Sequence, residues 1–447
     1  MTILSEQTAK NLLSKVIAYS KADEIECNLN GAVGGNIRYA RNTVSTAGEE
    51  SDVTLAVQSS FGKRVGVATI NEFDDASLEK VVRRSEELAR LAPENDEFMP
   101  VLGKQEYLST PTFVQATAQV TPEDRAQAAQ NSIEPSKKDK LIASGFLEEN
   151  TRFTAIMNSK GLFAYNTSTN VDFSVTVRTE DGKGSGWASQ NFSDVKLLDT
   201  AKASQIAIQK AKSSVDAKEM EPGKYTVILE PAASVTLLQN MFNNMSQRQA
   251  DEGRSFLSNK AKEGEDPEKV AKNKLGQKLF DERVHLYTDP QHPIAPYSPF
   301  GSDGSPINKI DWIKDGVVVN MPNSRYWAKK TGVPYVPADG NLLMAGGDES
   351  LEDMIKSTRR GVLVTRLWYI RSLDPQTLLY TGLTRDGTYY IENGKIKYPI
   401  KNFRFNESPI VMLNNIEALG KPVRIEGGMV PAMKIRDFTF SSLSDAV

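Results

Sequence analysis

The chain has 447 residues and a mass of 49.3 kDa, which is longer than one typical domain, so at least two hydrophobic cores are expected. Its 57 acidic and 54 basic residues leave a formal charge of −3, which argues against direct binding to nucleic acid or to an anionic membrane. The apolar runs are too short for a transmembrane or secretory segment, and the single cysteine, Cys27, excludes an intrachain disulfide framework. These features predict a cytoplasmic protein.

The first hundred residues alternate between helical and strand-like patterns. Residues 5–19 carry apolar side chains on one helical face after a capping serine, and therefore predict a helix. Strand-like segments follow at 24–29, 37–45, 53–59 and 64–70. Asp74 or Asp75 then caps a second predicted helix, and the acidic, proline-containing stretch 93–100 is typical of a linker.

A sequence pattern from this region recurs later in the chain. Residues 52–74 match residues 172–194 without a gap, including Gly66 with Gly186 and the turn residues Gly62 with Gly182. Similar turn chemistry can arise by convergence, and this is the alternative explanation. We interpret the match as a duplicated helix–strands–helix unit, which predicts two α/β subdomains at residues 1–95 and 96–218.

The pattern changes after residue 218. A strand is expected at 225–229, a helix begins at Pro231, and 261–278 is predicted to be exposed and mobile. Short strands then follow, with hairpin signals at Asp315-Gly316, Asp386-Gly387 and Asn393-Gly394 and one further short helix near 350–356. Residues 219–447 are therefore expected to form a mainly antiparallel β domain, and the chain an α+β protein.

The strand–proline–helix segment 229–244 is a suitable place for a catalytic motif. A zinc peptidase needs two histidines one turn apart on a helix, with a glutamate beside the first. Here the helix carries Gln239, Asn240, Asn243 and Asn244, and neutral amides bind zinc poorly. Taken alone, these amides are typical of a polar helical face.

Several longer motifs resemble the TldD/PmbA family, whose members are described as modulators of DNA gyrase and as zinc-dependent peptidases. The matching motifs are RQADEGRSF at 248–256, SRYWA at 324–328, SLEDMI at 350–355, TRLWYIR at 365–371, GLTRDG at 382–387 and IENGK at 391–395. The resemblance covers essentially the whole chain. It implies that the C-terminal domain is closed and curved, like a barrel.

The resemblance also concerns the metal site. In the metal-binding branch of the family, this helix carries His-Glu-x-x-x-His, and a cysteine nearer the C-terminus completes the site. Those helix positions are Gln239, Asn240 and Asn244 in this chain, and no cysteine lies in its C-terminal half. The resemblance therefore implies the metal-less type, similar to the PmbA (TldE) partner subunit. No cofactor is expected, and zinc is only the alternative.

The two histidines are the remaining metal candidates. His285 and His292, with Asp289 between them, form a weak possible metal set. Their neighbourhood is more typical of a strand that leads into a structured loop. Cys27 lies in a predicted strand and is interpreted as an inert buried thiol.

Charged residues just after the motif helix form a second candidate group. They are Arg248, Asp251, Glu252 and Arg254. They are either a solvated face or a network lining a peptide-binding cleft, in which Asp251 or Glu252 orders Arg254. A further group of aromatic and arginine residues is typical of cores and of interface anchors, and core packing is the favoured role for most of its members: Tyr326, Trp327, Trp368, Tyr369 and Arg371.

Three functional hypotheses follow. The first is a non-catalytic, peptide-binding subunit of a proteolytic complex that acts on unfolded or small peptides. It would form a homodimer, or a heterodimer with a metal-binding TldD-like subunit. The second is an active metallopeptidase with a non-standard metal site, and the third is an indirect regulator of DNA gyrase. Direct contact with nucleic acid or with a membrane is not expected.

Overall fold

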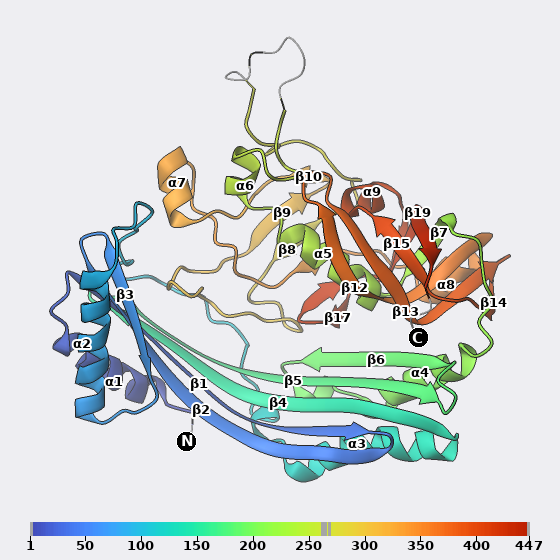
Figure 1. Cartoon of the computed structure of the whole chain (residues 1–447), viewed down its shortest axis with the longest axis horizontal. Coiled ribbons are helices and arrows are strands. Elements are labelled where there is room, and N and C mark those ends of the chain that lie inside the picture. Colours follow the sequence, from blue (N-terminus) through green and yellow to red (C-terminus); the bar gives the residue numbers. More distant parts are fainter. Residues whose placement is uncertain (1–2, 261–265, 267–269, 445–447) are drawn as a thin grey trace.

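The computed structural model describes residues 3–260, 266 and 270–444 (Figure 1). Its N-terminal half contains two successive units, each with a helix, three strands and a second helix. The first unit consists of α1 (Glu6–Tyr19), β1 (Glu24–Ala40), β2 (Thr43–Phe61), β3 (Arg64–Ile70) and α2 (Asp75–Leu91). The second consists of α3 (Pro122–Lys138), β4 (Leu141–Asn158), β5 (Phe163–Thr179), β6 (Ser185–Phe192) and α4 (Thr200–Ser213), with short 3-10 turns at Thr117–Gln119 and Val195–Leu197.

The strands of both units form one antiparallel sheet in the order β3-β2-β1-β4-β5-β6. The units meet where β1 pairs with β4, so each repeats the same order outward from the centre. Ile25 and Cys27 of β1 lie in the core under α1 and α2, and Ile37 and Tyr39 lie in the core under α3 and α4. All four are odd-numbered, so the helices share one face of the sheet. The opposite face is turned toward the C-terminal region (Figure 1).

The matched glycines have the same role in both units. A Cβ on Gly66 would lie 2.2 Å from the Ala89 backbone nitrogen of α2, and a Cβ on Gly186 would lie 2.1 Å from the Ala207 carbonyl oxygen of α4. Each glycine therefore lets its outer strand approach a helix backbone closely. This shared contact and the shared order of elements fit the duplication.

The two units also differ in detail. Val57 pairs with Ala68, whereas its counterpart Val177 pairs with Gly186, so the second hairpin is shifted in register. Asp74 caps α2, but Asp194 caps only the 3-10 turn, and α4 begins after Asp199 instead. The predicted strands 24–29 and 37–45 were wrong as separate elements, because pairing continues through the small residues at 31–35 and joins them in β1. The segment 37–45 also contains the turn between β1 and β2 at Arg41 and Asn42, which have positive φ.

A closed barrel lies in the C-terminal region, as expected. Its strands are β7 (Gly223–Leu229), β12 (Arg360–Asp374), β13 (Leu379–Glu392), β15 (Phe403–Glu407) and β19 (Met433–Leu443). β12 pairs with β7, β7 with β19, β19 with β15, β15 with β13, and β13 with β12, which closes the ring. The helix α5 (Pro231–Phe242) directly follows β7, and its apolar side packs in the largest core.

Smaller elements surround the barrel. A second, mostly antiparallel sheet has the order β10 (Val317–Val318), β9 (Ile310–Lys314), β8 (Leu286–Thr288), β11 (Leu343–Met344), β18 (Gly428–Val430) and β17 (Val423–Ile425). β14 (Lys395–Pro399) and β16 (Ile416–Leu419) pair with β13 and β19. The short helices are α6 (Gln247–Asp251), α7 (Arg325–Thr331), α8 (Leu351–Lys356) and α9 (Pro409–Asn414).

Two sequence expectations for this region were wrong. Helices α6, α7 and α9 occur in addition to α8, because each is too short to produce a clear periodic pattern. Asp386-Gly387 is not a hairpin turn but a bulge inside β13, where the pairing with β12 changes register and both residues have positive φ (55° and 120°). Hairpins and bulges favour the same residue types, so the sequence signal did not distinguish them.

Other expectations have mixed outcomes. Hairpins at Asp315-Gly316 and Asn393-Gly394 are confirmed. Within the segment 261–278 that was predicted to be exposed and mobile, residues 261–265 and 267–269 lie outside the described residues. The division of the chain at residues 95 and 218 stays a prediction. Within the described ranges, no helix is long and apolar enough to cross a membrane.

Candidate functional site at the junction of the sheet and the barrel

The three motif positions face in two directions. Gln239 and Asn240 lie on α5, and Asn244 lies in the turn just after it. The Asn240 side-chain amide donates to the Thr236 carbonyl at 2.9 Å, and the Asn244 amide donates to the Asn240 carbonyl at 2.8 Å and to the Tyr380 hydroxyl at 3.0 Å. Gln239 instead donates at 3.5 Å to the Glu426 carbonyl in the turn between β17 and β18. Asn240 and Asn244 therefore bond mainly to their own helix and to barrel strand β13.

This donor set does not fit zinc. A catalytic zinc needs imidazole or anionic ligands directed at one point, with an open position for water. The amides at Asn240 and Asn244 are neutral, and their N–H groups are committed to helix carbonyls and to Tyr380. In the described part of the chain, no three His, Cys, Asp or Glu side chains are grouped so that they could hold a metal ion.

The histidine candidates lie apart from α5 and serve other contacts. His285 Nε2 lies 2.9 Å from Asp311 Oδ1, while His292 Nδ1 accepts a hydrogen bond from the Ala295 backbone at 3.0 Å. Asp289 Oδ1 accepts from the Gln291 backbone at 3.0 Å. Partial burial lowers the pKa of His292, which favours the neutral ring that its acceptor role requires.

The charged group at 248–254 is organised by Glu252. Its carboxylate accepts hydrogen bonds from Arg254 and, at 3.1 Å, from Arg248. Arg248 also forms a two-bond fork with Glu97, each bond 2.8 Å long, and the arginines lower the pKa of both glutamates. Asp251 has a different role, since it accepts from the Trp327 indole at 2.8 Å and from Asn273 at 2.5 Å.

A cleft adjoins this group and the end of α5. Its volume is about 700 Å³, and Phe242, Asn243 and Ser246 line it from the α5 side. Acidic groups line other walls, among them Glu97, Asp303 and Asp339. Burial and the nearby Asp303 raise the pKa of Asp339. Asn243, rather than the zinc-motif positions, is the α5 amide that lines this cleft.

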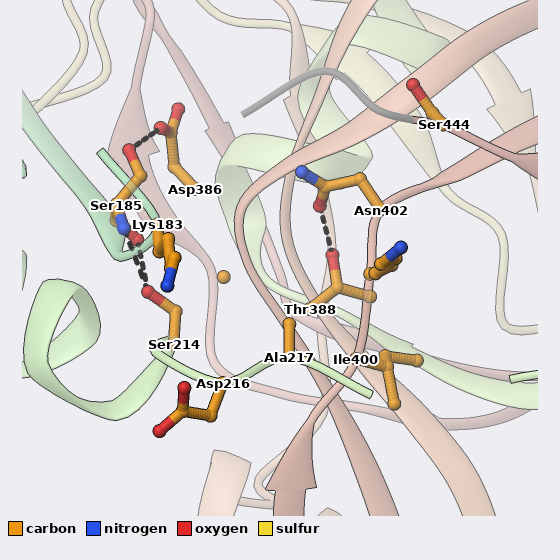
Figure 2. Close-up of a pocket in the computed structure, with 12 residues that line it drawn as sticks. Lys183, Ser185, Ser214, Asp216, Ala217, Asp386, Thr388, Ile400, Asn402 and Ser444 are labelled. Carbon is orange, nitrogen blue, oxygen red and sulfur yellow. Dashed lines mark hydrogen bonds between the residues drawn. The ribbon is translucent and has the colours of Figure 1, made fainter. Parts of the chain in front are cut away.

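A charged cluster that the sequence analysis did not identify lies where β6 meets the barrel. Asp386, at the bulge of β13, is buried. Its Oδ1 accepts from the Ser185 hydroxyl at 2.5 Å, as Figure 2 shows, and its Oδ2 accepts from Arg366 Nε at 2.6 Å. Burial lowers the pKa of Arg366, and Asp386 opposes that shift.

Aromatic rings flank the two arginines of this cluster. Arg366 lies over the Trp187 ring of β6 at 4.4 Å, and Arg385 lies over the Trp368 ring of β12 at 4.1 Å. The arginines are paired directly across β12 and β13. Trp368 and Tyr369 are 42% and 56% exposed and Arg371 is exposed as well, so the expectation of core packing for most of this group was wrong. It holds for the buried Trp327.

A second polar bridge joins the sheet to β17. Arg424 donates to the Asn191 carbonyl at 2.7 Å and to its side-chain oxygen at 3.0 Å. Asn191 in turn donates to Asn170 and Asp172 at 2.9 and 3.0 Å. Burial lowers the pKa of Arg424 to about 10 and raises that of Asp172. Shifted ionisable groups gathered at one junction are typical of functional sites.

A small pocket lies beside Asp386 (Figure 2). Its volume is about 260 Å³, with Lys183, Ser185 and Ser214 on the sheet side and Thr388 and Asn402 on the barrel side. The Ser214 hydroxyl bonds to the Ser185 backbone, and the Thr388 hydroxyl donates to Asn402 at 2.9 Å. Because these hydroxyls already bond to other protein groups, the residues of the pocket serve mainly to join the sheet to the barrel.

The sequence contained one signal for this junction. Arg366, Arg385 and Asp386 all lie in the TRLWYIR and GLTRDG motifs. Their partners Ser185 and Trp187 lie far away in the chain, and nothing in a single sequence links them to the motifs. The structure brings these residues together.

Three models of one family match this chain. The model of the PmbA/TldA metallopeptidase C-terminal domain matches residues 222–442, that of the central domain 117–215, and that of domain 1 30–89. The metalloprotease PmbA of Escherichia coli is 28% identical over 149 residues, which is 31% of this chain and 32% of that protein. The match thus spans about a third of the length of this curated relative.

Solved structures share the fold over nearly the whole chain. TldE from Thermococcus kodakarensis has a TM-score of 0.86 and 17% identity, covering 98% of this chain and 100% of that one. A Thermotoga maritima protein described as a proposed modulator of a DNA gyrase has a TM-score of 0.84 and 17% identity, covering 97% and 100%. At this identity the likeness concerns the fold alone.

Proposed function

The chain belongs to the PmbA/TldD metallopeptidase family, and from this premise we propose that it is a metal-independent, peptide-binding member of the family. It acts as the non-catalytic subunit of a proteolytic complex that handles unfolded or small peptides. It pairs with a metal-binding relative or with a second copy of itself. Its location is the cytoplasm, where the single buried thiol of Cys27 stays reduced.

One observation carries this proposal. The side chains at the three motif positions of α5 are neutral amides, and two of them direct their N–H groups to helix carbonyls and to Tyr380. A divalent cation at these positions would meet hydrogen-bond donors, and it would lack an anionic or imidazole ligand. Water activation by zinc therefore has no support from the residues of this helix.

The surroundings of α5 support a binding role. The cleft of about 700 Å³ lies beside the end of the helix and is large enough for several residues of an extended peptide. Its acidic residues and amides offer acceptors to peptide N–H groups and to a basic side chain or an N-terminal amine. Such contacts recognise the backbone more than any one side chain, which suits varied substrates.

Metal analysis and a cleavage assay test the proposal. The chain is purified alone and after co-expression with a metal-binding family member, and each sample is analysed for zinc and for cleavage of unfolded casein. The chain alone is expected to hold no stoichiometric zinc and to leave casein intact, whereas the complex should contain zinc and cleave it. Stoichiometric zinc in the chain alone, removed by a chelator together with activity, would support the alternative of a non-standard metallopeptidase.

A further inference from the structure

The guanidinium of Arg385 lacks the partners that a nearly buried arginine normally has. Its side chain is only 18% exposed, and its Nε is buried without a hydrogen-bond partner. Among the described residues, no hydrogen bond from this guanidinium is present. The nearest acid oxygen in an ion pair with it is Asp386 Oδ2, 3.8 Å from Nε, which is too far for a hydrogen bond.

The neighbouring charges do not compensate for this. Arg366 lies directly opposite Arg385 on the adjacent strand, an arrangement of like charges that is normally unfavourable. The carboxylate of Asp386 is already bonded to Arg366 and to the Ser185 hydroxyl. Arg385 therefore carries a positive charge whose donors remain available in a largely desolvated position.

The Arg385 guanidinium stacks on the indole ring of Trp368. The two groups lie 4.1 Å apart, and stacking on an indole fixes the plane of a guanidinium while leaving its N–H edge open. Trp368 is 42% exposed, and the next residue, Tyr369, is 56% exposed with a positive φ of 54°. A positive φ is uncommon for a bulky residue, and such backbone conformations are frequent at ligand-binding sites.

We propose that Arg385, stacked on Trp368, binds a carboxylate group of the peptide ligand. A carboxylate fits the fork of N–H donors in the plane of the guanidinium and adds the hydrogen bonds that the ion pair with Asp386 does not supply. The group is either the C-terminal carboxylate of the peptide or an acidic side chain. The inference rests on the proposed peptide-binding function and adds an anchor point to it, at the barrel rather than at α5.

Fluorescence anisotropy with three labelled peptides tests the anchor. The probes are N-terminally fluorescein-labelled hexapeptides of alanine and serine: one with a free C-terminus, one with a C-terminal amide, and an amide in which one residue is glutamate. The unmodified protein should bind the free acid at least tenfold more tightly than the plain amide. Arg385→Gln should abolish this difference without weakening the binding of the amide.

Arg371 offers a matched control. It stacks on Tyr369 at 4.3 Å, but it is exposed and donates to the Ile370 carbonyl at 3.2 Å. Arg371→Gln should leave the preference for the free acid unchanged. Arg385→Lys keeps the charge without the fork and should retain only part of the preference. Thermal unfolding of each variant shows that it is folded.

The possible outcomes separate the two proposals. Equal binding of all three peptides by the unmodified protein would overturn the carboxylate anchor while leaving the proposed function intact. A failure to bind any of the peptides would overturn both. If the glutamate-containing amide binds as tightly as the free acid, and Arg385→Gln weakens both, the anchor is supported with an acidic side chain as its source.

Discussion

The two halves of the N-terminal sheet have the same order of elements but are attached to the C-terminal region in different ways. The second half is joined through its strands and helix, by Ser185 to Asp386, by Asn191 to Arg424, and by a largely buried ion pair between Lys210 and Glu230. The first half is joined through the linker after α2, where Glu97 pairs with Arg248 at the surface and the Pro100 carbonyl accepts from Arg325.

This difference shows what a repeat preserves. The close contact of an outer strand with a helix recurs in both halves, because each half needs it to bury its own core. The contacts with the barrel region are not repeated: the buried Arg366 and Arg424 of the C-terminal region, whose pKa values burial lowers, contact Trp187 and Asn191 of the second half. The junction at Asp386 thus has the second copy as one wall, whereas the cleft beside the end of α5 is lined by Glu97 in the linker after the first copy.

Asp386→Asn should have the largest effect on stability. The substitution leaves Arg366 largely buried without its counter-ion and places an amide N–H where a carboxylate oxygen accepted a bond. We expect a loss of about 3–5 kcal/mol in the free energy of unfolding. Urea unfolding measures it, with Glu97→Gln in the first half's exposed ion pair as the control that should change little. Equal losses of unfolding free energy in the two variants would mean that both halves of the sheet are attached to the C-terminal region with similar strength.

Gly66→Ala and Gly186→Ala should each cost about 3 kcal/mol. In both, the added methyl group would lie within about 2.2 Å of a helix backbone atom, and a backbone cannot move aside as a side chain can. The two losses should be similar because the contact is the same in the two halves. Comparison of the two unfolding curves tests this, and a tolerated alanine at one position would show that the repeat is not equivalent there.

Much of the fold could be predicted from the sequence, because periodicity and turn residues are local signals. The helix over 5–19 and its cap at Ser5 are confirmed, as are two of three hairpin turns. The closed β region is also confirmed, but it was expected from the family resemblance and not from these local signals. Asp386-Gly387 failed as a hairpin since a bulge needs the same positive φ. Whether such a pair forms a hairpin turn or a bulge depends on whether the neighbouring strand continues past it. Residues far away in the sequence determine this.

The site was less predictable than the fold. The amides at Gln239, Asn240 and Asn244 could be identified by their position, but their hydrogen bonds could not. Arg385 lies in the GLTRDG motif, yet the role proposed for it rests on hydrogen bonds that its buried Nε lacks. Missing hydrogen bonds of this kind can be recognised only when the positions of all neighbouring residues are known, here those of the described part of the chain.

Glu26→Gln should change how the stability of the protein depends on pH. Burial raises the pKa of Glu26 in β1 to about 7, above its ordinary value near 4.5. The folded protein therefore holds a proton that the unfolded chain has released, so this contribution to stability is full below about pH 4.5 and is lost as the pH rises through 7. Between pH 5 and 8 the unmodified protein should lose about 2 kcal/mol relative to the variant.

Urea unfolding of the two proteins at pH 5 and pH 8 measures this difference. Glu26 belongs to the first half, where the buried carboxylate has amide neighbours such as Asn28 in place of a directly bonded arginine. If the difference in unfolding free energy between the two proteins is the same at pH 5 and pH 8, the pKa of Glu26 in the folded protein is not raised. The first half would then contain no buried acid with a shifted pKa.

The smallest effect is expected from rebuilding the zinc motif on α5. The triple variant Gln239→His, Asn240→Glu and Asn244→His restores the residue types of the metal-binding branch. We expect it to gain at most weak zinc affinity, since the cysteine that completes the site in that branch has no counterpart in this chain. The new side chains must also leave contacts with the Thr236 carbonyl and with Tyr380, at about 1 kcal/mol for each lost hydrogen bond.

Titration with zinc against a chromogenic chelator measures the affinity, and the unmodified protein is the control. Weak binding would mean that zinc binding at these positions lacks more than the right residue types. The direction of the side chains and the absent cysteine ligand would also limit it. Tight binding would show that α5 still presents a preorganised metal geometry, and that only the residue types had changed. In that case α5 would be a candidate site in its own right beside the junction of β6 and the barrel, and the contrast between the two halves of the sheet would not decide between them.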